Sequence, residues 1–146
     1  MIRYGQIQLR PCSQGMHLSM ISYISNALKC FHHKPLEKPQ DQPHPHIKSN
    51  YGAKSQYTDN PDTPPLLGNI DIKFIQEVVV TLLYCARSVD ITMLIAFGSI
   101  KVQQAAPTET TMTKVNQLLD YATSHPDAIV TYTAIDMVLA GHSSAS

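Results

Sequence analysis

Residues 75–86 read IQEVVVTLLYCA, and this stretch decides the fold of the chain. Its apolar residues recur at intervals of three and four, a spacing that predicts a helix with one buried face. Asn69 or Asp71 can cap this helix at its start. The buried face consists of Ile75, Val78, Val79, Leu82, Leu83 and Ala86. A core can therefore form in this part of the chain, and we expect a mainly α protein of the α+β class.

Two further helices and two strands are predicted after this helix. Asp90 caps the second helix, and Thr108, next to Pro107, caps the third. Their inward residues are Met93, Leu94, Phe97 and Ile100 in the second helix, and Val115, Leu118, Leu119 and Ala122 in the third. The third helix ends at 125–127, and strands over 129–132 and 137–141 then form a hairpin around the turn 134–136. Residues 69–128 thus form a three-helix region, and residues 129–146 begin a β region.

Residues 1–33 are predicted to form a short hairpin and a helix. Residues 3–9 alternate weakly between polar and apolar, 12–15 have the composition of a turn, and 16–18 can return as a second strand. Ser19 is placed as the N-cap of the helix. The apolar stripe of this helix consists of Met20, Tyr23, Ile24, Ala27, Leu28 and Phe31. The helix is expected to stop before Pro35.

Residues 34–68 have no sustained period of either kind. They are rich in proline, histidine, asparagine and aspartate, which is typical of an extended linker. A structureless stretch longer than about 15 residues is unusual inside a compact domain. We expect this Pro/His-rich linker either to be disordered or to pack along a surface that is missing here.

Charge and cysteine content narrow the classes of function. Eleven basic residues balance eleven acidic ones, so no global field favours a nucleic acid or an anionic membrane. The three cysteines are widely spaced, which favours free thiols in a reducing compartment. Residues 1–10 lack the apolar run of a signal peptide, and Arg87 and Asp90 interrupt the most apolar window, which breaks a membrane span of about 20 residues. We expect a soluble intracellular protein, cytoplasmic or nuclear, without a membrane partner.

No set of residues predicts catalysis. Four histidines lie close together in or beside the linker: His32, His33, His44 and His46. A metal site needs defined geometry that a proline-rich loop does not supply, so adventitious nickel or zinc binding is the favoured interpretation. The serines stand in no GxSxG motif, and the glycines form no phosphate-binding loop. Cys85 is interpreted as buried filler and Asp120 as part of a solvated helix face, so we expect no enzyme, no cofactor and no small-molecule substrate.

Several segments, taken in order, resemble a known family. The series begins with His17-Leu18-Ser19-Met20, continues in the linker with Tyr51-Gly52-Ala53-Lys54, and passes through Leu118-Leu119-Asp120-Tyr121 to the tail MVLAGHSSAS at 137–146. Together these segments resemble the polymerase polyprotein of copia-type retrotransposons, over residues 16–146. Ile21 and Val80 depart from the family pattern, which has proline and glycine near those positions.

The resemblance implies the thumb and connection between the reverse-transcriptase palm and ribonuclease H, a part that grips the template–primer duplex without catalysis. Residues 1–33 would be a thumb-like remnant, and residues 129–146 the truncated start of an incomplete ribonuclease H-like fold. In the family the tail strand presents an aspartate that binds catalytic metal, and Ser144 stands at that position here. A serine cannot replace the charge of a carboxylate on magnesium, the metal that the family uses. The polymerase aspartates have no counterpart in the sequence.

Three functions remain open. The favoured one is a catalytically inactive fragment of the polymerase polyprotein. The second is a weak, non-specific nucleic-acid-binding module, whose candidate contacts are Lys73, Arg87, Lys101 and Lys114. These cations are dispersed, so binding should depend strongly on salt, and Arg87 flanks a helix junction where a structural role is favoured. The third is a helical module that associates with itself, or with another polymerase fragment, through uncovered apolar patches.

Overall fold

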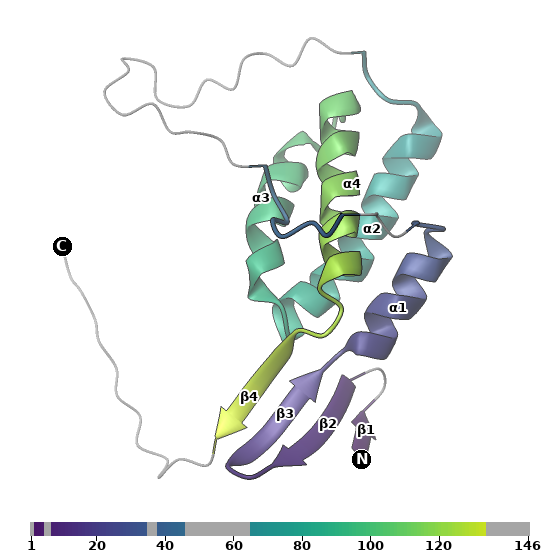
Figure 1. The fold of residues 1–146 in the computed structure, drawn as a ribbon. Coiled ribbons are helices and arrows are strands. Elements are labelled where there is room, and N and C mark those ends of the chain that lie inside the picture. The colour runs from purple at the N-terminus through teal and green to yellow at the C-terminus, as the bar shows by residue number, and fades with distance from the viewer. Residues whose placement is uncertain (1, 5–6, 35–37, 46–64, 134–146) are drawn as a thin grey trace, which may run out of the picture.

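The computed structural model describes residues 2–4, 7–34, 38–45 and 65–133. In chain order the elements are β1 (Ile2–Tyr4), β2 (Ile7–Cys12), β3 (Gly15–Ser19), α1 (Ile21–Cys30), α2 (Asn69–Ser88), the 3-10 helix η1 (Ile91–Met93), α3 (Leu94–Gln103), α4 (Glu109–Ser124) and β4 (Ile129–Thr133). This mixture of helices and strands confirms the α+β class. Figure 1 shows the sheet at one end of the helices, with β3 leading into α1 and β4 following α4.

The four strands form one antiparallel sheet in the order β1-β2-β3-β4. Leu9 lies opposite Leu18, which lies opposite Val130, so these three side chains share one face of the sheet. The prediction of one strand over 3–9 is wrong, because these residues are divided between β1 and β2, which pair with each other. β4 has β3 as its neighbour, and the predicted partner strand at 137–141 lies outside the described residues.

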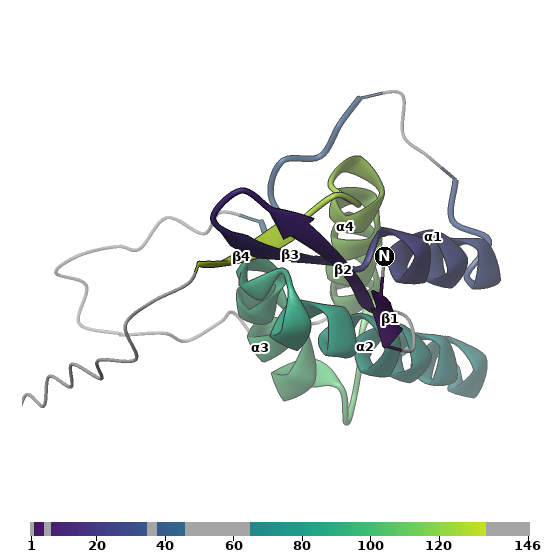
Figure 2. The same cartoon turned by 90° about the horizontal axis from the view of Figure 1, so that it is seen from below.

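One hydrophobic core joins the helices and the sheet. Ile24 of α1 belongs to the same buried cluster as residues of α2, α3 and α4, and Leu18 and Val130 of the sheet pack against it. The sequence divides the chain at residues 33 and 128, but residues from both sides of each division contribute to this cluster. Figure 2 shows the sheet from below, in front of the helices, and Ile7 of β2 and Leu18 of β3 pack against the core.

The predicted buried faces of the helices are largely correct. All four inward residues predicted for α4 are buried, and so are five of the six predicted for α2, with Leu83 half-buried. In the second predicted helix, the prediction that Leu94 faces inward is wrong, because this side chain is 39% exposed. Met93 begins the buried face there, and at about 3.6 residues per turn the next members are Ala96, Phe97 and Ile100. Leu94 therefore points away from them.

Two of the predicted helix caps are confirmed. The carboxylate of Asp90 accepts a hydrogen bond from the amide of Thr92 at the start of η1. Thr108 caps α4, and its amide donates to the hydroxyl of Thr111. At the other two helix starts the predicted caps are wrong, and residues without a capping side chain hold the positions: Gly68 in place of Asn69 or Asp71, and Met20 in place of Ser19.

Parts of the predicted linker have a defined place. Residues 38–45 lie against α4, and Leu66 pairs with Thr108 in an isolated bridge, while the amide of Leu67 donates to the carbonyl of Pro107. These residues pack on other parts of the same chain, which neither of the two expectations for the linker includes. Among the described residues, none of the helices has the length and apolar character that crossing a membrane requires.

Candidate functional site

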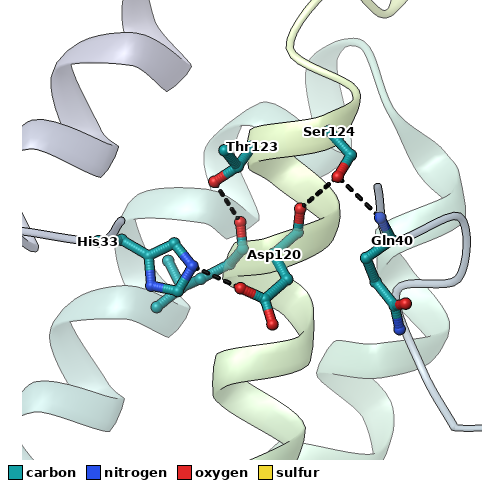
Figure 3. Close-up of polar contacts among 6 residues, drawn as sticks. His33, Gln40, Asp120, Thr123 and Ser124 are labelled. Carbon is teal, nitrogen blue, oxygen red and sulfur yellow. Dashed lines mark hydrogen bonds and ion pairs between the residues drawn. The ribbon is translucent and has the colours of Figure 1, made fainter. Parts of the chain in front are cut away.

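Polar contacts gather where α4 meets the end of α1 and residues 38–45, which we call the strap. Figure 3 shows that His33 and the strap residue Gln40 approach α4 from opposite sides. On α4, Asp120 contacts His33, and Ser124, one turn later, accepts a hydrogen bond from Gln40. The site therefore joins three segments that are far apart in the sequence.

The end of α1 fixes the position of His33. The amides of His32 and His33 donate to the carbonyl oxygens of Lys29 and Leu28, each at 3.1 Å. This pair of bonds is the Schellman arrangement, in which the residue after the helix takes a left-handed conformation. His32 does so, with a φ of 51°. The chain therefore turns sharply after α1, and His33 points toward α4.

The imidazole of His33 contacts the carboxylate of Asp120. His33 Nε2 lies 2.7 Å from Asp120 Oδ1, and the two side chains are 16% and 20% exposed. The interpretation of Asp120 as part of a solvated helix face is therefore wrong. No local pattern signals this pair, because the partners are 87 positions apart and each looks like an ordinary surface residue in its own segment.

Hydrogen bonds between uncharged groups hold the strap on α4. The amide of Gln40 donates to the hydroxyl of Ser124 at 2.9 Å, and that hydroxyl donates to the carbonyl of Asp120 at 2.9 Å. One side-chain nitrogen of Gln117 donates to the carbonyl of Gln42 at 3.0 Å. These bonds satisfy backbone groups of a segment that has no secondary structure of its own.

A second histidine lies against the strap at the end of α4. His125 Nε2 lies 3.4 Å from Asp41 Oδ1, and the His125 ring packs 4.8 Å from the ring of Tyr121. This nitrogen is buried and makes no hydrogen bond within the described part of the chain. His44 Nε2, in the strap itself, is likewise buried without a described partner.

Serine, histidine and aspartate meet in this site, but their bonds differ from those of a nucleophilic triad. In such a triad the histidine accepts the serine proton and the aspartate orients the histidine. Here the Ser124 hydroxyl donates to the backbone carbonyl of Asp120 and accepts from Gln40. The polar contact of the His33 ring within the described residues is with Asp120, and it does not reach Ser124. The geometry serves to attach the strap.

The three described histidines of the cluster do not form a metal-binding group. His33 is bound to Asp120, His44 lies in the strap, His32 is exposed after α1, and His46 lies outside the described residues. Within the part of the chain that the structure covers, no group of three or more histidine, cysteine or acidic side chains has an arrangement that could hold a metal ion.

The candidate nucleic-acid contacts lie on three different helices. Lys73 and Arg87 are exposed near opposite ends of α2, separated by about 21 Å at 1.5 Å per residue. Lys101 is exposed in the last turn of α3. Lys114, on α4, donates to the side-chain carbonyl of Gln103 at 3.1 Å. Their role in binding stays a prediction, and Ser144 lies outside the described residues.

A separate polar group links the start of η1 to α4, and in it Asp90 and Tyr121 are buried while Thr92 is exposed. Asp90 accepts a hydrogen bond from the Thr92 hydroxyl, and that hydroxyl lies 2.9 Å from the hydroxyl of Tyr121. The other carboxylate oxygen of Asp90 is buried without a described hydrogen-bond partner. Burial raises the pKa of the nearby Cys85 thiol to about 11, and the negative charge of Asp90 adds to this effect. Cys85 is fully buried, as the sequence predicts.

Comparisons with models of protein families, with curated proteins and with solved structures gave no match.

Proposed function

We propose that this chain is a catalytically inactive segment of a copia-type retrotransposon polymerase polyprotein, from the connection between reverse transcriptase and ribonuclease H. The observation that carries the proposal is the order in which segments from His17 to the tail match that family. Helices with the expected buried faces over 69–124, followed directly by a strand, are compatible with such a connection.

The proposed absence of activity follows from the set of carboxylates that the chemistry requires. Ribonuclease H chemistry needs several carboxylates that hold two metal ions beside the attacking and leaving oxygens. Ser144 stands where the family has the first of these carboxylates, and a neutral hydroxyl does not supply the charge that magnesium requires. The proposed role is structural, as a spacer between units that perform chemistry.

The purified protein, incubated with an RNA–DNA hybrid and magnesium, is expected to leave the hybrid intact. Ser144→Asp is the matched variant, and it should also be inactive, because one carboxylate does not make a two-metal site. Cleavage by the wild-type protein would overturn the inactive assignment. Cleavage by Ser144→Asp alone would contradict the expectation that further carboxylates are lacking. The origin is tested separately by sequencing the flanking genomic DNA, where polymerase reading frames are expected. Unrelated flanking sequence on both sides would contradict that origin.

Self-association is a second candidate, favoured by the outer face of α3. Ile95 and Val102 are 72% and 83% exposed and lie two turns apart on α3, and Ile91 in the preceding η1 is 70% exposed. Exposed apolar residues that line up along a helix are typical of an interaction surface. If this face pairs two copies, Ile95→Lys should shift sedimentation at high concentration toward the monomer. Ile70→Lys, at the exposed start of α2, is the control and should not. Monomeric wild-type protein would exclude this candidate.

A further inference from the structure

One edge of the sheet, at β4, has backbone groups that no described strand pairs. Within the described residues, β4 pairs with β3 and with no other strand. A Cβ atom on Gly15 would lie 1.8 Å from the carbonyl oxygen of Tyr132, so this carbonyl points toward β3. The direction of these groups alternates along an antiparallel strand. The amide and carbonyl of Thr131 therefore point toward the open edge, as do those of Ile129 and Thr133.

β4 lacks the features that usually protect an edge strand. Natural edge strands avoid pairing with other chains through charged residues, proline or short length. β1, at the other edge of the sheet, is only three residues long. β4 has five residues, four of them exposed, and all are uncharged and either β-branched or aromatic: Ile129, Val130, Thr131, Tyr132 and Thr133. Residues of these types favour strands, so this edge is suited to accept another strand.

We propose that this edge pairs with β4 of a second copy of the chain, antiparallel and centred on Thr131. This register aligns all five residues of both strands. It places Val130 opposite Tyr132 of the second copy, and a β-branched residue beside an aromatic one is a favourable cross-strand pair. Leu18 lies beside Val130, and Met16 lies beside Tyr132. The rows of apolar side chains therefore continue from one sheet into the other.

The position of the helices favours the antiparallel arrangement. Figure 1 shows that β4 runs away from the helices, which lie beside the start of the strand. Antiparallel pairing puts the helices of the two copies at opposite ends of the joined sheet, whereas parallel pairing would bring them side by side. A two-fold axis at Thr131 relates the copies, so the same surface is used twice and the assembly closes as a dimer. The pairing does not depend on the origin of the chain.

Residues 137–141 are the other candidate for this edge, because the sequence predicts a hairpin there. The residues that would form its turn are Ala134, Ile135 and Asp136, and they include no glycine. Tight hairpin loops need left-handed backbone positions, which glycine adopts most readily. The sequence of this turn therefore favours a second copy as the occupant of the edge.

Sedimentation equilibrium of the full chain tests the pairing. Five residues on each side make a small contact, so we expect a weak dimer, measured at up to about 1 mM protein. Thr131→Pro removes the amide that points toward the open edge and leaves the bonds of β4 with β3 in place. Because the dimer loses two hydrogen bonds, its dissociation constant should rise by about tenfold or more. Ile95→Lys, on the outer face of α3, is the control and should keep the dimer.

A pair of charged variants tests the register without proline. Thr131 faces Thr131 of the second copy, so Thr131→Lys and Thr131→Glu should each weaken the dimer, because like charges then lie opposite each other. An equimolar mixture of the two should associate at least as strongly as the wild type. A wild-type protein that is monomeric at about 1 mM would overturn the proposal. So would a mixture that associates no better than either variant alone, or a dimer that only Ile95→Lys dissociates.

Discussion

His32 has a left-handed backbone conformation, with a φ of 51°, which costs an L-residue about 1–2 kcal/mol. Glycine adopts this conformation without that cost but loses more freedom on folding. His32→Gly is therefore expected to raise the free energy of unfolding by about 0.5–1 kcal/mol, as measured by urea denaturation. His32→Ala is the control and should bring no gain. A glycine variant less stable than the wild type would contradict the assigned turn.

Cys85 should make stability fall at alkaline pH. Its folded-state pKa is about 11, against an ordinary value of 9.0, so the unfolded chain loses the thiol proton first. The contribution of this thiol to stability is complete below about pH 9 and is lost as the pH rises toward about 11. Urea denaturation at several pH values should show this decline, and Cys85→Ala should show a flatter one. Equal pH profiles for the two proteins would contradict the burial effect.

The aspartates show which site residues a sequence can reveal. Asp90 follows one helix and precedes another, and its partner Thr92 is only two positions away in the sequence. A local rule for helix caps therefore predicts the role of Asp90. Asp120 pairs with His33, which lies in a different segment. Its role depends on how α1 and α4 pack, and no local spacing contains that information. The attachment of the strap could not be predicted for the same reason.

Among the elements, α3 is the one whose sequence pattern is ambiguous. Between Leu94 and Gln103 its one charged residue is Lys101, so apolar residues lie on both sides of the helix. The buried side holds Ala96, Phe97 and Ile100, and the outer side holds Ile95 and Val102. Periodicity predicts one buried face well when the opposite face is polar, as in α4. In α3 this contrast is missing, and the spacing therefore wrongly predicts that Leu94 is buried.

Two glycines in different elements should respond in opposite ways to the same substitution. A Cβ atom on Gly15 would lie 1.8 Å from the carbonyl oxygen of Tyr132, so Gly15→Ala must push β3 and β4 apart. We expect it to lower the free energy of unfolding by about 1–3 kcal/mol. A Cβ atom on Gly98, in α3, would meet nothing within 4 Å, and Gly98→Ala should add about 0.5–1 kcal/mol. Thermal or urea denaturation measures both, and equal effects would contradict the close approach of the strands.

In the whole molecule, the sheet connects the two ends of the described chain. The sequence predicts strands near both ends, but alternation of residues within a strand does not tell which strand is its neighbour. The pairing of β3 with β4 places Leu18 and Val130 side by side over the helices. Helix bounds and most buried faces could be predicted because they depend on local spacing. The pairing of β3 with β4 joins residues more than 100 positions apart, and local patterns do not encode it.

A shared core implies that sheet and helices unfold together. Val115, in α4, is fully buried, and Leu18, in β3, is half-buried against the same cluster. Val115→Ala should lower the free energy of unfolding by about 2 kcal/mol and Leu18→Ala by about 1–2 kcal/mol. Each variant should shift one common urea transition, seen alike by circular dichroism and by tyrosine fluorescence. Ile129→Ala, at an exposed position of β4, is the control and should change little. Two separate transitions would instead mean that sheet and helices fold independently, because a substitution in one unit would then leave the other transition in place.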